Sequence, residues 1–158
     1  MKSVLGALAL GVLLVSSSAL LARGAAPDPA VGTWKLNTAK STSATLPRSE
    51  TRTYTAKGGA LTLSYTRVSA DGKEISVQTT YKYDGKDYPI TGSPDYDTLS
   101  VKRVDSHTAE STQKLAGKVV GSTTRTVSKD GKTLTLVTKT TNTSGETTTA
   151  TLVYDRQQ

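Results

Sequence analysis

Cysteine is missing from this 158-residue chain, which excludes disulfide bonds and the lipid-attachment cysteine of a bacterial lipoprotein. Phenylalanine is also missing, and His107 is the only histidine. Few side chains are therefore available for nucleophilic or metal catalysis, because the chain has no thiol and no His or carboxylate cluster with a metal-ligand spacing. His107 follows Ser106 at a strand start and is expected to be a solvated turn residue. We expect no catalytic residue, no metal site and no cofactor.

Large aliphatic residues are scarce as well. Leu, Ile and Val supply 21 of the 132 residues from Pro27 onward, which is below the roughly 20% that separates globular from disordered chains. The same segment contains 28 threonines, and threonine is β-branched and enriched in strands. We therefore expect an ordered protein with a sparse, partly polar interior.

The N-terminus has the pattern of a secretory leader. Lys2 precedes an apolar run from Val4 to Val15, and small residues lie between Ala19 and Ala26. This pattern predicts a cleavable signal peptide over residues 1–24, cut between residues 22 and 26, and a single domain over residues 27–158. A retained membrane anchor is the alternative, but three serines from Ser16 to Ser18 interrupt the run. We expect an exported protein, periplasmic or secreted, that does not span the membrane after cleavage.

The formal charge of +7 falls to +5 when Lys2 and Arg23 leave with the leader, since 18 basic residues then face 13 acidic ones. The lysines are scattered along the chain and form no run of the kind that marks a nucleic-acid surface. We therefore expect a solvated basic surface, no nucleic-acid partner and a monomer.

Regularly spaced turn glycines are the clearest structural signal. Two sets recur at intervals of 13 and 14 residues, namely Gly59, Gly72 and Gly85, and then Gly117, Gly131 and Gly145. Several stand in Asp-Gly-Lys, as at Asp71 and Asp130, and Asp-Gly between β-like runs is a strong hairpin signal because the turn needs a positive φ. Each interval thus holds one strand and one turn.

Between the turns, apolar residues alternate with Thr, Ser and Lys, a period of two that is typical of strands with one buried face. This pattern predicts strands near residues 31–37, 48–57, 60–69, 74–83, 97–104, 107–115, 118–128, 132–141 and 147–155, with a possible short one at 86–91. The fold class is therefore all-β, an antiparallel up-and-down meander of nine or ten strands closed into a lipocalin-like barrel. A two-sheet β-sandwich is the alternative.

Two motifs resemble those of the lipocalins and fatty-acid-binding proteins, the calycin superfamily. Gly32 to Leu36 reads Gly-Thr-Trp-Lys-Leu, similar to the Gly-x-Trp start of those barrels, and Val153 to Arg156 resembles the Tyr-acid-base ending of the fatty-acid-binding branch. The pattern looks closest to small secreted bacterial lipocalin-like proteins of unassigned function. The resemblance implies structural roles for Gly32, Trp34 and Arg156, with Arg156 or Arg125 stacked on the tryptophan.

One position departs from that branch. Its members hold the ligand carboxylate partly through an Arg two residues before the terminal Tyr, and Leu152 stands there in this chain. Tyr154 carries over and its arginine does not. The resemblance therefore implies the barrel without the family's usual mode of binding a fatty acid.

Three arginines share the register of apolar residues on their strands. Arg67 and Arg103 lie at predicted strand ends, where a side chain can reach water, whereas Arg125 lies in mid-strand and suits either an anionic ligand or a structural pairing. Four tyrosines lie on predicted inward faces, where they either face a ligand or pack in a wet core: Tyr65, Tyr81, Tyr83 and Tyr154.

These features predict a non-enzymatic barrel that binds a small hydrophobic or amphipathic ligand in its interior. The expected ligand-binding residues are Leu63, Tyr65, Val77, Tyr81, Tyr83, Val101, Arg125, Leu136 and Tyr154. The alternative is a cell-envelope interaction module, with a barrel filled by its own side chains, that contacts protein or polysaccharide through its Thr-rich outer face or its loops. An enzyme ranks third.

Overall fold

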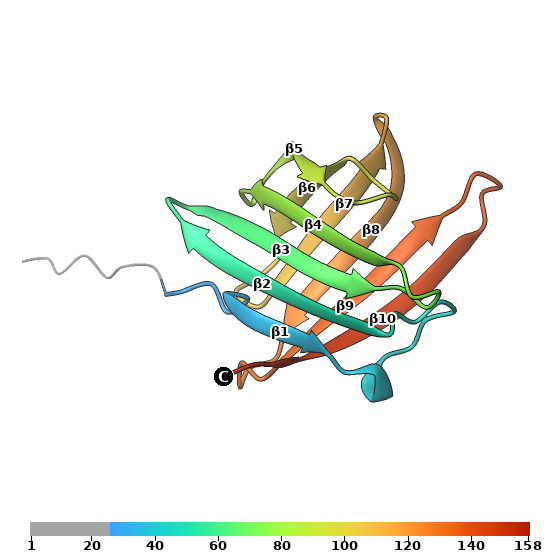
Figure 1. The fold of residues 1–158 in the computed structure, drawn as a ribbon. Coiled ribbons are helices and arrows are strands. Elements are labelled where there is room, and N and C mark those ends of the chain that lie inside the picture. The colour runs from blue at the N-terminus through green and yellow to red at the C-terminus, as the bar shows by residue number, and fades with distance from the viewer. Residues whose placement is uncertain (1–25) are drawn as a thin grey trace, which may run out of the picture.

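The structure is a computed structural model that describes residues 26–158, so the predicted leader, residues 1–24, lies outside the described residues. Residues 26–158 form ten antiparallel strands in one closed barrel (Figure 1). The strands are β1 (Gly32–Leu36), β2 (Ser49–Lys57), β3 (Ala60–Val68), β4 (Glu74–Tyr81), β5 (Asp84–Thr91), β6 (Thr98–Arg103), β7 (Thr108–Leu115), β8 (Lys118–Val127), β9 (Thr133–Thr141) and β10 (Thr147–Arg156).

Each strand pairs with its neighbour in sequence, and β1 pairs with both β2 and β10, which closes the sheet. The predicted meander barrel is confirmed, including the short strand near residues 86–91, which is part of β5. Closure leaves no exposed sheet edge, whereas the two-sheet sandwich would leave four. The closed meander is consistent with a lipocalin-like fold.

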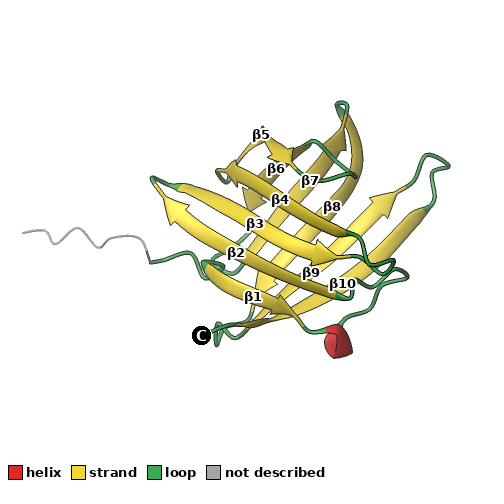
Figure 2. Ribbon diagram, viewed as in Figure 1, coloured by secondary structure: helices red, strands yellow, loops and turns green. Residues whose placement is uncertain are grey.

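Helix is almost absent from residues 26–158, where one 3-10 turn, η1 (Thr38–Lys40), follows β1 (Figure 2). In the same residues, no helix has the length and apolar character needed to cross a membrane.

The predicted Asp-Gly turns at Gly72 and Gly131 form as expected, whereas the turn predicted at Gly85 is wrong, because Gly85 lies within β5 at a register shift against β6. In the β8–β9 connection Gly131 has a φ of 69°, its N–H donates to the Ser128 carbonyl at 2.8 Å, and the Asp130 carboxylate accepts from the N–H of Lys132 at 3.0 Å. The left-handed backbone favours glycine, and the aspartate side chain satisfies an amide that the turn leaves unpaired.

Trp34 lies at the start of the barrel with no exposed surface. The Arg156 guanidinium lies 4.1 Å from the centre of its ring, and the indole N–H donates to the Ala30 carbonyl at 2.8 Å. Arg156 also donates to the carbonyls of Val31 at 2.8 Å and Pro29 at 2.6 Å. Of the two arginines considered from sequence, Arg156 is thus the one stacked on the tryptophan.

Gly32 makes this arrangement possible because it has no side chain. Its φ is 134°, and a Cβ at this position would collide with the Arg156 guanidinium. The missing Cβ thereby leaves room for the Arg156 side chain beside the start of β1.

The two ends of the barrel differ. The connections β2–β3, β4–β5, β6–β7 and β8–β9 share one end in a meander of this kind. Residues 28–31 reach that end, where Ala30 is fully buried and Asp28 contacts Tyr83 and Arg103. The opposite end holds the longer connections after β1 and β5, and the interior is open toward it.

Candidate functional site

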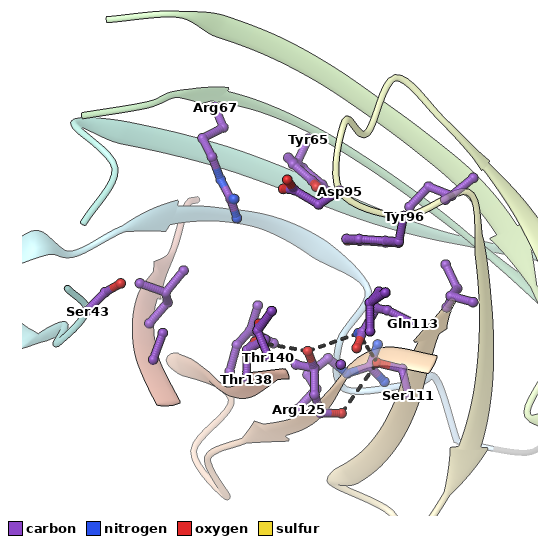
Figure 3. A pocket seen from close by; sticks show the side chains of 18 of the residues that line it. Ser43, Tyr65, Arg67, Asp95, Tyr96, Ser111, Gln113, Arg125, Thr138 and Thr140 are labelled. Atoms are coloured by element: carbon purple, nitrogen blue, oxygen red, sulfur yellow. Dashed lines mark hydrogen bonds between the residues drawn. The ribbon is translucent and has the colours of Figure 1, made fainter. Parts of the chain in front are cut away.

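The interior holds a cavity of about 640 Å³ that opens toward the β1–β2 and β5–β6 connections. Small-molecule sites in proteins are usually about 300–1,000 Å³, so this volume suits one small ligand. Ser43, Asp95 and Tyr96 surround the mouth, and the side chains of Arg67 and Arg125 reach inward from opposite walls (Figure 3).

The cavity has one largely apolar wall and one wall that contains most of its uncharged polar side chains, here called the polar wall. Strands β3 to β6 supply the apolar residues Leu63, Tyr65, Tyr81, Ile90, Leu99 and Val101. Strands β7 to β9 supply the polar residues Ser111, Gln113, Thr123, Thr138 and Thr140, beside the apolar residues Ala109, Leu115, Val120 and Leu136. A bound molecule would therefore meet mainly hydrocarbon on one side and hydrogen-bonding groups set among hydrocarbon on the other.

Arg125 reaches the cavity from mid-β8 and is 8% exposed. Its Nη1 donates to the Tyr81 hydroxyl at 3.0 Å and its Nη2 to the Tyr83 hydroxyl at 2.5 Å. The buried Nε–H has no partner in residues 26–158. A charged group in the interior thus retains a buried donor without a partner.

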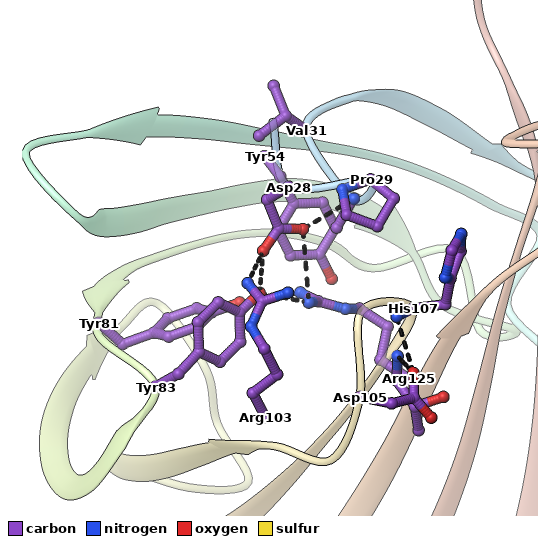
Figure 4. A network of polar contacts seen from close by, with 12 residues as sticks. Asp28, Pro29, Val31, Tyr54, Tyr81, Tyr83, Arg103, Asp105, His107 and Arg125 are labelled. Carbon is purple, nitrogen blue, oxygen red and sulfur yellow. Dashed lines mark hydrogen bonds and ion pairs between the residues drawn. The ribbon is translucent and has the colours of Figure 1, made fainter. Parts of the chain in front are cut away.

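Asp28 supplies the nearest negative charge, but Arg125 does not hold it alone (Figure 4). Its carboxylate accepts hydrogen bonds from Arg103 and from the Tyr83 hydroxyl at 2.7 Å, whereas Arg125 Nη2 lies 4.0 Å away. Burial alone would raise the pKa of Asp28, but the hydrogen bonds from Tyr83 and Ala30 and the two nearby guanidinium charges lower that pKa. Asp28 is therefore ionised and shared by two arginines.

A second carboxylate, Glu50, is 1% exposed at the start of β2. It accepts from Arg52 Nε at 2.7 Å, from Arg67 Nε at 2.6 Å and from the Tyr154 hydroxyl at 3.0 Å. Burial would raise the pKa of Glu50, and the charges and hydrogen bonds of the two arginines outweigh that effect and lower it. Glu50 thus holds two guanidinium groups at the cavity wall while remaining hidden itself.

The interior is cationic as a result. Each cluster sets two arginines against one carboxylate: Arg52 and Arg67 with Glu50, and Arg103 and Arg125 with Asp28. Three of the four arginines line the cavity, and the lining contributed by residues 26–158 contains one carboxylate, that of the exposed Asp95 at the mouth.

Six of the nine residues predicted to bind a ligand line the cavity, namely Leu63, Tyr65, Tyr81, Val101, Arg125 and Leu136. Val77, Tyr83 and Tyr154 do not. Val77 is buried opposite Tyr65, Tyr83 lies past the end of β4 against Asp28, and Tyr154 is covered by Arg52, whose guanidinium is 4.6 Å from its ring centre. Alternation predicts which face a side chain takes, but not whether neighbours cover it.

The two arginines expected at strand ends differ. Arg67 lines the cavity and pairs with Glu50, whereas Arg103 is exposed and reaches Asp28 outside the cavity. Leu152 lines the cavity where the fatty-acid-binding branch has its arginine. An arginine does lie beside Tyr154, but it is Arg52, which comes from β2 and is already paired with Glu50.

Sequence reasoning missed Asp28, Glu50, Arg52 and Gln113. A signal existed for three of them. Glu50 and Arg52 alternate with Tyr54 on one face of β2 while Thr51 and Thr53 occupy the other. Tyr54 is 2% exposed, so its face is the inner one. Gln113 likewise alternates with Ala109 and Ser111 on one face of β7, opposite Glu110 and Lys114, whereas Asp28 lies before β1 and carries no such pattern.

No protein-family model matches this chain, and no curated protein matches it significantly.

Proposed function

We propose that the barrel binds one small amphipathic molecule in its interior, with an anionic group of that molecule beside Arg125. The observation that carries this proposal is the buried guanidinium of Arg125, with an unpaired Nε–H, at the wall of a cavity of about 640 Å³. We also propose that the chain is a member of the calycin superfamily, on the strength of its closed meander and its Gly-x-Trp start.

The electrostatics support an anion. A buried charge is unfavourable unless it is paired, and Asp28, the nearest carboxylate to Arg125, is engaged by Arg103. An anionic group in the cavity would supply the missing charge and accept from the free Nε–H, while the leucines and tyrosines of β3 to β6 would cover its hydrocarbon part.

The proposed role is binding without catalysis. In the lining contributed by residues 26–158, no imidazole lies next to a hydroxyl that it could activate, since His107 is outside the cavity. We further propose that the protein acts as an exported monomer, as the leader pattern and the closed sheet edges favour. Cell fractionation with the intact mass of the mature chain tests export.

Native mass spectrometry of the chain purified from its own envelope fraction, followed by extraction of any co-purifying molecule, tests the proposal without assuming a ligand. A stoichiometric small anion would support it. A chain that carries nothing and also ignores fluorescent fatty-acid and polycyclic probes would contradict it.

A matched pair of probes tests the role of Arg125. Arg125→Met should weaken binding of dodecanoic acid about tenfold to hundredfold, because hydrogen bonds to charged groups contribute about 1.5–3 kcal/mol, and should leave dodecanol binding nearly unchanged. Arg48→Met removes an exposed guanidinium that donates to the Ala70 carbonyl, and it serves as the control. Equal losses for acid and alcohol would argue against an anion site.

One further observation favours the interaction module as a second candidate. The outer face of β2 to β5 carries an open groove of about 390 Å³ whose exposed residues are uncharged, including Thr51, Ser64, Thr66 and Gln78. Rows of hydroxyls suit hydrogen bonding to a polysaccharide. Binding of the chain to isolated envelope polysaccharide, lost in a Thr66→Val variant and kept in Arg125→Met, would favour this candidate.

A further inference from the structure

The polar wall of the cavity contains a buried acceptor that the protein leaves unused. Gln113, on β7, is 8% exposed and lines the cavity (Figure 3). Its amide nitrogen donates to Ser111 Oγ and to Thr123 Oγ1, both at 3.0 Å. Its carbonyl oxygen, Oε1, is buried and has no partner in residues 26–158.

The neighbours of Gln113 determine which end of its amide is free. The Ser111 hydroxyl donates to the main-chain carbonyl of Thr123 at 3.4 Å, so its oxygen is available only as an acceptor. Ser111 therefore binds the amide nitrogen of Gln113 and not the carbonyl oxygen. The carbonyl oxygen is thus the end of the amide that has no partner in residues 26–158.

Gly121 lies beside that carbonyl and has no side chain of its own. It is the register partner of Gln113 and itself lines the cavity. A Cβ at this position would lie 3.4 Å from Gln113 Oε1 and 2.8 Å from the Lys139 carbonyl oxygen. Any larger residue would thus crowd the acceptor and displace backbone.

We infer that the bound molecule carries a hydrogen-bond donor on its body, a hydroxyl or an amide N–H, that pairs with Gln113 Oε1. This inference rests on the proposed function and narrows its ligand class to hydroxylated or amidated amphiphilic acids. A ligand with a plain hydrocarbon body would cover a buried acceptor without pairing it, which is unfavourable.

The spacing of the two polar groups places the donor away from the anion. Arg125 is the register partner of Ala109, which precedes Gln113 by four residues on β7. Four residues of strand span about 13 Å, so a ligand with its anionic group at Arg125 would present its donor in the middle of a long body.

A matched pair of acids tests this inference: 12-hydroxystearic acid, which has a mid-chain hydroxyl, and stearic acid, which has none. Their dissociation constants are measured by titration calorimetry on the wild-type chain, on Gln113→Met and on the control Gln78→Met, whose glutamine is exposed on the outer face. We expect the hydroxy acid to bind the wild type at least about tenfold more tightly, as one added hydrogen bond to a buried acceptor allows. The preference should vanish in Gln113→Met and persist in Gln78→Met.

The outcomes separate the two levels of the proposal. Equal affinities of the wild type for both acids, or a preference that survives Gln113→Met, would overturn the inference and leave interior binding intact. Failure of the wild type to bind either acid or dodecanoic acid would overturn both. If Gln113→Met does not fold, as judged by circular dichroism, the affinities of the wild type for the two acids still test the inference, because equal affinities would overturn it.

Discussion

At the scale of single residues, the unusual feature of this barrel is its buried charge. Glu50 and Asp28 each pair with two arginines, so each carboxylate offsets the repulsion between two like charges. Removing one partner of a buried ion pair destabilises a fold much more than replacing both partners with apolar residues, because an uncompensated charge remains. The carboxylates are therefore the sensitive members of the clusters.

Glu50→Gln should destabilise the fold by about 3 kcal/mol or more, since Arg52 and Arg67 would lose their counter-charge in a buried site. Urea unfolding followed by circular dichroism measures the change. Asp87→Asn breaks the partly exposed pair with Lys114 and should cost no more than about 1 kcal/mol. Similar losses in the two variants would show that the Glu50 cluster contributes no more than a surface pair.

The same cluster predicts a dependence of stability on pH. The lowered pKa of Glu50, against an ordinary value of 4.5, means that its stabilisation is complete above about pH 4.5 and is lost as the pH falls through the lowered pKa. The free energy of unfolding should thus decline in acid in the wild type and decline less steeply in Glu50→Gln.

At the scale of elements, the β4–β5 seam is the weakest in the barrel. Strands β3 and β4 pair over eight positions, whereas β4 and β5 pair only at Gln78 with Thr91 and at Thr79 with Ile90. Pro89 has no N–H to donate to the ladder, and its carbonyl accepts a side-chain hydrogen bond, from the Thr79 hydroxyl at 2.9 Å. Few ladder hydrogen bonds leave a seam that can open locally.

Hydrogen exchange should therefore reveal faster exchange in the amides of β4 and β5 that face each other than in those between β2 and β3. Mass spectrometry of peptides from residues 74–91 and 49–68 makes the comparison. Equal protection of the two seams would contradict the assignment of β4–β5 as the weak one.

At the scale of the whole molecule, the barrel is closed by a short stretch of pairing between its first and last strands. Strand β1 pairs with β10 over only three register positions, and Arg156 adds the stacking on Trp34 and hydrogen bonds to three main-chain carbonyls, those of Val31, Pro29 and Gly131. A single side chain near the C-terminus thus joins the N-terminal segment to the last strand.

Arg156→Met should destabilise the barrel by about 2 kcal/mol, because the cation–π contact is lost and the carbonyls lose their donor. It should also shift the fluorescence of Trp34, the only tryptophan, to the red as water reaches the ring. Thermal unfolding and emission spectra measure both effects, with Gln157→Met as the control. An unshifted spectrum would mean that β1 and β10 close the barrel without Arg156.

Much of the architecture could be read from local patterns. The Asp-Gly turns and the alternation of apolar with hydroxyl side chains predict where the strands lie and which face is inner, because turn geometry and strand period are properties of neighbouring residues. The predicted place of Arg125 on an inner face follows from the same period.

Tertiary structure alone decided which inner residues surround empty space and how the charges are shared. Tyr154 and Arg125 both face inward by register, yet Arg52 from a distant strand covers the first, while the second reaches the cavity. Asp28 shows no pattern in sequence, since it lies before β1 and its partners Tyr83 and Arg103 are far along the chain. Strand alternation is local, but filling a barrel depends on side chains far apart in sequence, so the sequence determined the barrel and its inner face, and the closed fold determined the cavity and its charges.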